Sequence, residues 1–219
     1  MRRALLTGIV FAALAGTAAA QTARPPSGSS GSSIGIRGYA AIDFTSPAAS
    51  KSFDAVFGSS QTTSFGGGAE IDVWQHLFVR FALTHAKRTG TRVFVDDTGQ
   101  VFPLNIPLTV TMTPIEGAAG WRFATRSRFT PYIGGGIVSL GYQETPDFAQ
   151  AGDVVNERYT GGEGFGGVDV AIAKGFFVGG EAQFRHIGVP DASSSVMHQF
   201  SETDIGGFTA RVLIGFSTR

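Results

Sequence analysis

Hydrophobic and polar residues alternate with a period of two in eight separate segments of the chain. This alternation is typical of β-strands that bury one face. The segments comprise residues 34–44, 65–74, 77–83, 108–123, 132–142, 164–173, 176–185 and 205–217. Most reach the length of about 9 to 11 residues that a tilted strand needs to cross a membrane. Pro114 lies within the fourth segment and predicts a bulge or bend there.

The connections between these segments alternate strictly in length. The long connections are residues 45–64, 84–107, 143–163 and 186–204, and the short ones are residues 75–76, 124–131 and 174–175. Barrels of bacterial outer membranes have long loops at the outer end and short turns at the periplasmic end. The sequence therefore predicts an all-β fold, an eight-stranded antiparallel up-and-down transmembrane β-barrel with both termini on the periplasmic side.

Charged residues keep to one face of each predicted strand, and the other face is apolar. These charged residues are Arg37, Asp43, Glu70, Asp72, Arg80, Glu116, Arg122, Asp169, Glu181, Arg185 and Arg211. An eight-stranded barrel has an interior only wide enough for side chains. If the charged face points inward, the five arginines and six carboxylates nearly cancel. We expect them to pair across the lumen and plug it, because buried charges are tolerated only when paired.

The alternation alone is equally compatible with a soluble, lipocalin-like barrel whose apolar face points inward. The loop asymmetry favours the membrane barrel, and so do two features of composition. Lysine occurs only at Lys51, Lys87 and Lys174, all in connections, whereas a water-facing exterior usually carries many lysines. Aromatic residues gather near the strand ends, as in the interfacial girdles of membrane barrels. They are Phe44, Phe65, Trp74, Trp121, Phe123, Tyr132, Tyr142, Phe176 and Phe216.

The first 20 residues have the pattern of a cleavable secretory signal peptide. Arg2 and Arg3 precede an apolar run over residues 4–15, which is too short for a spanning helix, and alanines 18–20 supply the cleavage site. Residues 21–33 are rich in Pro, Gly and Ser and predict a flexible leader. We therefore expect a signal peptide (1–20), a leader (21–33) and one barrel domain (34–219), exported to the bacterial outer membrane.

Composition excludes several partners and kinds of site. The formal net charge of zero argues against nucleic acid as a partner, and the absence of cysteine excludes disulfides and thiolate metal sites. We expect no catalytic residues, no cofactor and no metal. The glycine triplets 66–68 and 134–136 are followed by no lysine and open no helix, so they are not phosphate loops. They are better explained as relieving crowding where strands bend.

Three segments carry a resemblance to a known family. They are residues 113–117 (TPIEG), residues 131–136 (PYIGGG) and the closing alternation over residues 208–216. On these segments the chain resembles the small outer-membrane β-barrel domain family, the relatives of the transmembrane domain of outer-membrane protein A and of opacity-type surface proteins. The resemblance implies a monomeric barrel inserted by the barrel assembly machinery, which recognises a last strand ending in an aromatic residue. Phe216 takes that place, three residues before the last residue given.

We expect a structural or surface barrel protein without enzymatic activity, whose long loops serve surface interaction or envelope integrity. Its expected partners are outer-membrane lipid, lipopolysaccharide and an extracellular ligand of unspecified chemistry. Two alternatives use the same scaffold. A lipid A-modifying enzyme needs a nucleophile, a base and an orienting acid at one rim, and His76, His85, His186 and His198 do not match the His-x-Ser-Asn motif of the deacylase type. A narrow pore for small solutes needs a continuous lumen.

Overall fold

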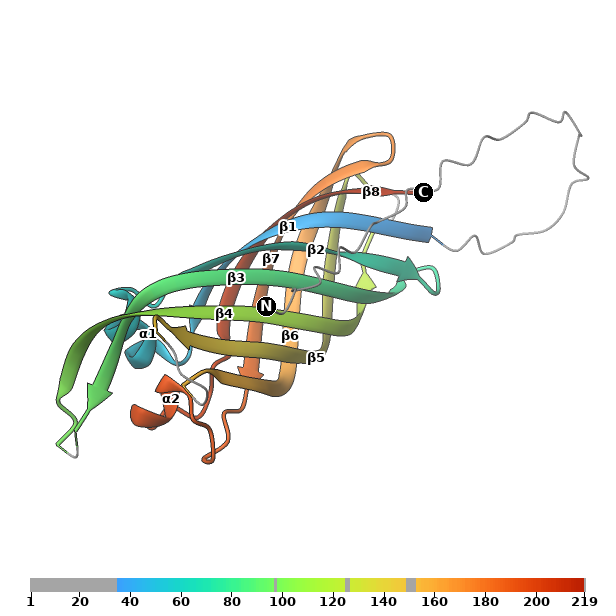
Figure 1. The fold of residues 1–219 in the computed structure, drawn as a ribbon. Coiled ribbons are helices and arrows are strands. Elements are labelled where there is room, and N and C mark those ends of the chain that lie inside the picture. Colours follow the sequence, from blue (N-terminus) through green and yellow to red (C-terminus); the bar gives the residue numbers. More distant parts are fainter. Residues whose placement is uncertain (1–34, 97, 125–126, 149–152, 219) are drawn as a thin grey trace, which may run out of the picture. The chain divides into compact units, whose positions relative to one another are not determined.

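The computed structural model describes residues 35–96, 98–124, 127–148 and 153–218, so the predicted signal peptide and leader lie outside the described residues. The elements are β1 (Gly35–Pro47), α1 (Ser50–Phe57), β2 (Thr62–Asp72), β3 (Leu77–Val95), β4 (Val101–Arg122), β5 (Phe129–Pro146), β6 (Val155–Ala173), β7 (Phe176–Ile187), α2 (Val196–Gln199) and β8 (Gly207–Ser217). Each strand pairs with its sequence neighbours, and β1 pairs antiparallel with β8 to close the barrel (Figure 1). The predicted eight-stranded antiparallel barrel is confirmed. None of the helices in the described part of the chain is long and apolar enough to span a membrane.

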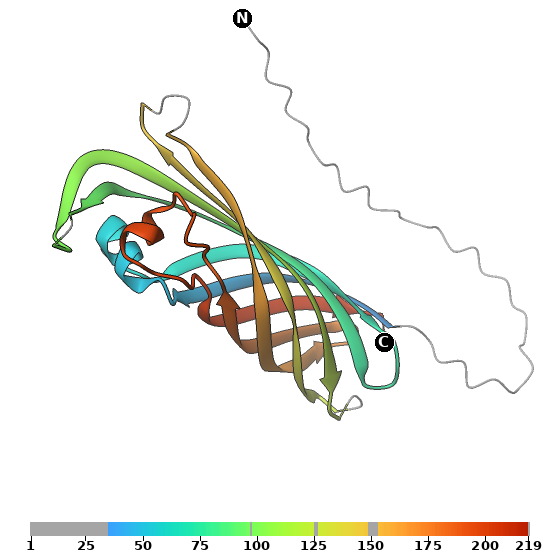
Figure 2. The same cartoon turned by 90° about the horizontal axis from the view of Figure 1, so that it is seen from below.

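The four strands β3 to β6 are much longer than the alternation predicts. β3 continues to Val95, β4 begins at Val101, and their last pairs, Val95 with Val101 and Phe94 with Phe102, close a hairpin. β5 and β6 form a second long hairpin that reaches to Pro146 and Val155. The prediction that residues 84–107 and 143–163 are loops was therefore largely wrong. Figure 2 shows both hairpins extending beyond the other strands at one end of the barrel.

The tip of the β3–β4 hairpin is organised by Asp96. The Asp96 carboxylate accepts hydrogen bonds from the hydroxyl and backbone N–H of Thr98 and from the backbone N–H of Gln100. These bonds, that of the Thr98 hydroxyl above all, lower the pKa of the Asp96 carboxyl below its usual value. Asp97 lies outside the described residues.

Pro114 does not produce the bulge that its place in the strand predicts. The pairs Leu83 with Ile115 and Ala86 with Met112 share one register across it, and Pro114 itself is in register with Leu140 of β5. The register between β3 and β4 shifts elsewhere, between Thr91 and Val93. Because proline has no backbone N–H, Pro114 cannot donate a hydrogen bond to a neighbouring strand, but the strands keep their register.

The glycine triplet of residues 66–68 lies where neighbouring strands approach closely. A Cβ atom at Gly66 would stand 2.1 Å from the carbonyl oxygen of Leu83, and one at Gly67 would stand 2.3 Å from that of Tyr39. No side chain fits at these distances. The explanation that these glycines relieve crowding is confirmed.

The barrel has two chemically different ends. The turn end carries the short connections, including Lys174 and Gly175, where Gly175 has a φ of 79° that favours glycine. The loop end carries α1, α2 and the two long hairpins, as Figure 1 shows.

The apolar face of the strands points outward, opposite to its direction in a lipocalin-like barrel. Many large apolar side chains on this face are well exposed, from 38% at Val168 to 73% at Ile137. Seven aromatics predicted at the interfaces are exposed, namely Phe44, Phe65, Trp74, Trp121, Phe123, Phe176 and Phe216. Tyr132 and Tyr142, predicted in the same girdles, are instead buried inside the barrel. Tyrosine fits the interior because its ring packs while its hydroxyl meets polar groups.

Candidate functional site: a charged lumen under an apolar cap

All eleven charged residues that share one strand face in the sequence point into the lumen. Ten of them are buried, and the side chain of Asp72 is 13% exposed. They form one connected series of ion pairs along the lumen. The series begins at Asp72 near the turn end and runs through Glu70, Arg80 and Arg211 toward the loop end.

The half of the network nearest the turn end is built on Glu70. Arg122 donates to Asp72 at 2.5 Å and also to Glu70. Arg37 donates to Asp169 at 2.7 Å and lies 3.8 Å from Glu70. Arg37 of the neighbouring strand β1 and Arg122 of β4 thus converge on one carboxylate of β2.

Arg80 joins the two halves of the network. Its guanidinium lies 2.8 Å from Glu70 and 2.7 Å from Glu181, which stand on different strands. The same guanidinium lies 4.3 Å from the centre of the Phe165 ring. Arg80 therefore has a carboxylate on each side and an aromatic face against its plane, an arrangement that stabilises a buried cation.

Arg211 and Arg185 form the half nearest the loop end. Arg211 donates twice to Asp43, at 2.7 and 2.8 Å, and twice to Glu116, at 2.8 and 3.0 Å. Arg185 donates to Glu116 and, at 3.3 Å, to Glu163. The bidentate Arg211 pairs lie in a part of the lumen where all three side chains are fully buried.

Two further members of this half of the network, Glu163 and Gln183, are not among the lumen residues predicted from the sequence. Glu163 falls in a predicted loop, but it stands on β6 opposite Arg185 of β7. Gln183 donates to Glu181 at 2.6 Å and accepts from Arg185 at 2.5 Å. Both share the parity of charged residues on their own strands, Asp169 and Glu181, and this parity was the signal available to find them.

The lumen opens at the turn end into a basin of about 940 Å³. Arg37, Asp72, Arg122 and Asp169 line its floor, and His76 stacks on Trp121 at its rim with ring centres 5.2 Å apart. The floor is the same series of ion pairs described above. The basin is therefore closed on its inner side by the ion-pair network.

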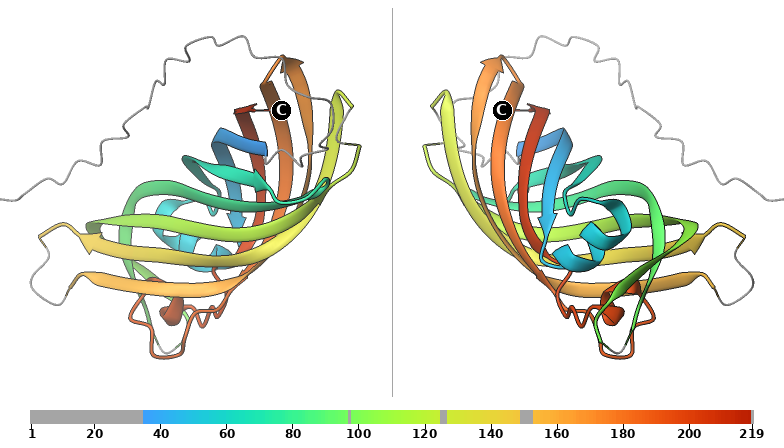
Figure 3. Two further views of the ribbon diagram at one scale, coloured as in Figure 1. Left: turned by 90° about the vertical axis from the view of Figure 1, so that its right-hand side faces the viewer. Right: turned by 90° about the vertical axis from the view of Figure 1, so that its left-hand side faces the viewer.

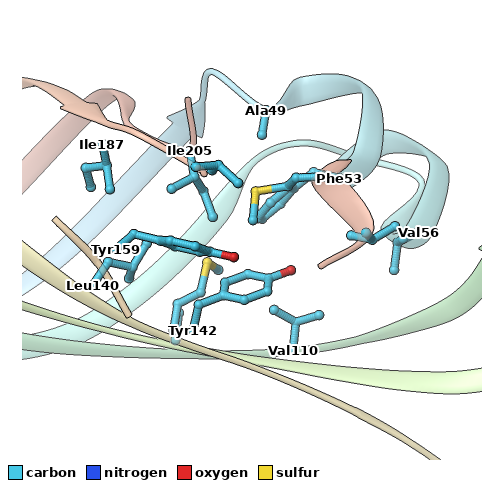
Figure 4. Packing of buried hydrophobic residues seen from close by; sticks show 14 of the residues in the cluster. Ala49, Phe53, Val56, Val110, Leu140, Tyr142, Tyr159, Ile187 and Ile205 are labelled. Atoms are coloured by element: carbon cyan, nitrogen blue, oxygen red, sulfur yellow. The ribbon is translucent and has the colours of Figure 1, made fainter. Parts of the chain in front are cut away.

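At the loop end the lumen is covered by an apolar cap, defined here as α1, α2 and the residues between β7 and β8. In Figure 3, α1 lies across the opening that the strands surround. Phe53, Val56 and Met197 of the two helices are at most 4% exposed and pack against inward residues of the long hairpins. Figure 4 shows Phe53 pointing from α1 toward Tyr142 and Tyr159, whose ring centres are 5.8 Å apart. Phe53 and Val56 therefore serve the local packing of the cap.

Three carboxylates fasten the cap. Glu202 accepts from the backbone N–H groups of Lys51 and Ser52, at 2.8 and 3.1 Å, in the first turn of α1. Glu144 of β5 accepts from the backbone N–H of Val196 at 2.8 Å, at the start of α2. Glu157 of β6 accepts from the hydroxyl of Ser193 at 2.7 Å and the backbone N–H of Ser194 at 2.8 Å. The cap is thus tied to α1 and to the β5–β6 hairpin.

We expect Glu202→Ala to loosen the cap and leave the barrel intact. The substitution removes both acceptors of the first turn of α1, and local opening should become easier by about 1 to 2 kcal/mol. Amide hydrogen exchange of residues 50–57 measures this, with Asp191→Ala, an exposed carboxylate of the same connection, as the control. Unchanged exchange in Glu202→Ala would mean that the carboxylate does not fasten α1.

The nearest approach to a catalytic arrangement is His186 with Asp204. His186 Nδ1 lies 2.8 Å from Asp204 Oδ2, and the His186 side chain is 74% exposed on the outer wall. Within the residues that the structure describes, no hydroxyl is hydrogen-bonded to His186, and Ser193 and Ser195 are bonded to each other instead. The base and the acid of a triad are present, and the nucleophile that the enzyme alternative requires is not at the dyad.

Comparisons with known proteins agree with this architecture. The family model described as outer membrane protein beta-barrel domain matches residues 9–216. The crystal structure of outer membrane protein OprG from Pseudomonas aeruginosa is similar, with a TM-score of 0.51 and 12% identity over 85% of this chain and 95% of that one. Neisserial surface protein A is similar with a TM-score of 0.49 and 14% identity, over 84% of this chain and 95% of that one. Ail of Yersinia pestis, crystallised with the heparin analogue sucrose octasulfate, has a TM-score of 0.48 and 10% identity, over 84% of this chain and 97% of that one. A comparison with curated proteins finds no match.

Proposed function

Because the chain belongs to the outer membrane protein β-barrel domain family, we propose that it is a non-conducting, non-enzymatic surface protein whose loop end faces away from the cell. In this role the barrel is an anchor, and the hairpins and cap of the loop end carry the interactions. The family supports a barrel protein of the outer membrane and envelope. The closed lumen and the form of the loop end support the more specific role.

The observation that carries the proposal is the double closure of the lumen. The ion pairs fill it from Asp72 to Glu163, and the apolar cap covers its loop end. A cavity of about 50 Å³, with Phe53 and Arg185 in its lining, lies between the two layers. This volume accommodates a water molecule or two and no larger solute. A pore would need a continuous path through both layers.

Recording ion current across planar bilayers that hold the refolded chain tests this proposal. We expect no steady current above that of the bare bilayer, because both layers block the lumen. Phe53→Ala, which thins the cap alone, should remain non-conducting because the ion pairs still fill the lumen below it. Steady single-channel currents in the unaltered protein would support the narrow-pore alternative instead.

The β3–β4 hairpin is the proposed contact surface for an extracellular partner. Its outer arms expose Phe94, Phe102 and Leu104 by 53%, 41% and 44%, beyond the strand segments that carry the outward apolar face. Exposed apolar side chains grouped on a projecting element often mark protein or lipid contacts. The hairpin is fixed by paired strands up to Val95 and Val101, so the surface is formed before a partner binds.

A further inference from the structure

A hollow of about 510 Å³ lies in the outer wall of the barrel, across β3 to β6. The outward residues that line it are Phe81, Ile115, Gly117, Ile137, Ser139 and Thr160. Its volume falls within the range of about 300 to 1,000 Å³ that is usual for ligand sites. Because this wall carries the exposed apolar face, the hollow opens toward lipid.

Glycines on the outward face leave room at the hollow, since Gly117 lines it and Gly162 lies next to the lining residue Ile137. A Cβ at Gly117 would meet no atom within 4 Å, and one at Gly162, beside Ile137 in the register, would meet only the carbonyl oxygen of Gly136 at 3.9 Å. Neither glycine has a positive φ. The close strand approach that explains Gly66 therefore does not explain these two, and the barrel itself would accept larger residues.

Cationic side chains lie on the same outward face as the hollow, nearer the loop end. Ser139 and Thr160 are its hydroxyl-bearing members, and Arg158 follows on the same face of β6, two residues nearer the loop end. Lys87 stands on the outward face of β3, opposite Thr111. Among the described residues, no ion pair involves Arg158 or Lys87, whereas Asp204, on the same outer wall, is paired with His186.

We propose that this hollow binds an acyl chain of a phosphorylated membrane lipid in the leaflet at the loop end, with the phosphate near Arg158 and Lys87. The apolar walls fit a hydrocarbon chain, the hydroxyls of Ser139 and Thr160 meet the polar linkage, and the unpaired cations complement the phosphate. Only the identity of the leaflet rests on the proposed function, in which the loop end faces away from the cell. The binding itself depends on the wall of the barrel.

The decisive test compares two glycine-to-leucine variants. Gly117→Leu fills the hollow, and Gly180→Leu adds the same side chain on the outward face of β7, where a Cβ likewise meets nothing within 4 Å. The refolded protein in detergent micelles is incubated with bisphosphorylated lipid A, and the lipid that stays bound is counted by native mass spectrometry. We expect one lipid A per unaltered barrel, about tenfold less in Gly117→Leu from the loss of apolar contact, and no change in Gly180→Leu.

A second arm tests the headgroup. Arg158→Gln and Lys87→Gln should each weaken retention of bisphosphorylated lipid A about fivefold, as expected for one cation at an anionic surface, and should leave that of dephosphorylated lipid A unchanged. Inorganic phosphate at millimolar concentration should not displace the lipid, because the chain supplies the main contact. The proposal is overturned if Gly117→Leu retains as much lipid as Gly180→Leu, if both phosphorylation states bind alike, or if phosphate alone displaces the lipid.

Failure here is distinguishable from failure of the proposed function. Lipid retention is measured on the outer wall, and the absence of ion current depends on the lumen. A conducting barrel that still binds one lipid would contradict the proposed function alone, and a non-conducting barrel with no bound lipid would contradict this inference alone.

Discussion

Replacing Arg211 with methionine is expected to lower the free energy of unfolding by about 3 to 5 kcal/mol, the usual loss when one partner of a buried ion pair is removed. Arg211 is fully buried and donates to Asp43 and Glu116 at 2.7 to 3.0 Å. Methionine fills much of the volume but leaves two buried carboxylates without this cation. The effect therefore comes from stranded charge and not from a void.

Reversible urea unfolding of the protein in detergent micelles or bilayers measures this loss. Arg128→Met, in the exposed connection between β4 and β5, is the matched control and should change stability by less than about 0.5 kcal/mol. Adding Asp43→Asn to Arg211→Met should recover part of the loss, since the stranded carboxylate is then neutral. Equal effects of Arg211→Met and Arg128→Met would show that the lumen network does not contribute to stability.

Val212→Arg is expected to cost about 2 to 4 kcal/mol when the protein is folded in a bilayer, the usual cost of an arginine on the lipid face near mid-membrane. Val212 is the sixth of the 11 residues of β8 and is 51% exposed on the outward face, beside Ile42 of β1 and Gly180 of β7. An arginine there must either lie in hydrocarbon or bend toward a distant interface.

Val154→Arg is the control for this substitution. Val154 is 41% exposed but lies before β6 at the loop end, outside the lipid-facing wall, so an arginine there should cost less than about 0.5 kcal/mol. Both variants are unfolded in urea from vesicles of the same composition. A near-neutral Val212→Arg would mean that water, and not lipid, surrounds the apolar face.

The sequence predicts the lumen well because a strand has a fixed period of two. Arg37 and Asp169 are 132 residues apart, yet parity alone places both on the inner face, and the structure joins them at 2.7 Å. The rule works wherever the outer face is apolar. It fails for Glu163, because Gly161, Gly162 and Gly164 around it have no side chains to show an alternation.

The loop end could not be predicted in the same way. Strands that project into water need no lipid-facing apolar face, and the arm of β3 from Thr84 to Arg92 carries polar residues on both faces, so no alternation reveals it. The cap is harder still, because α2 has only four residues and α1 eight. Their placement depends on contacts such as Glu202 with Lys51, 151 residues away, which leave no periodic pattern.

For two tyrosines, the expectation that aromatic residues near strand ends face outward is wrong. Tyr132 and Tyr142 stand near strand ends, as girdle residues do, but both share the parity of inward positions on β5. Tyr132 packs against Phe78 and Phe165 within the lumen, and the Tyr142 hydroxyl donates to Glu144 at 2.7 Å. Parity within the strand is therefore a better guide to the face than distance from the strand end.

The most direct test of an apolar face turned outward is gel migration of the refolded chain with and without boiling. The chain is diluted from urea either into detergent micelles or into plain buffer. We predict that only the detergent sample gives a shifted, protease-resistant band that boiling abolishes, because the exposed apolar wall needs a hydrocarbon phase. A chain that folds in plain buffer, with the same band before and after boiling, would contradict the account and place the apolar face inside a soluble barrel.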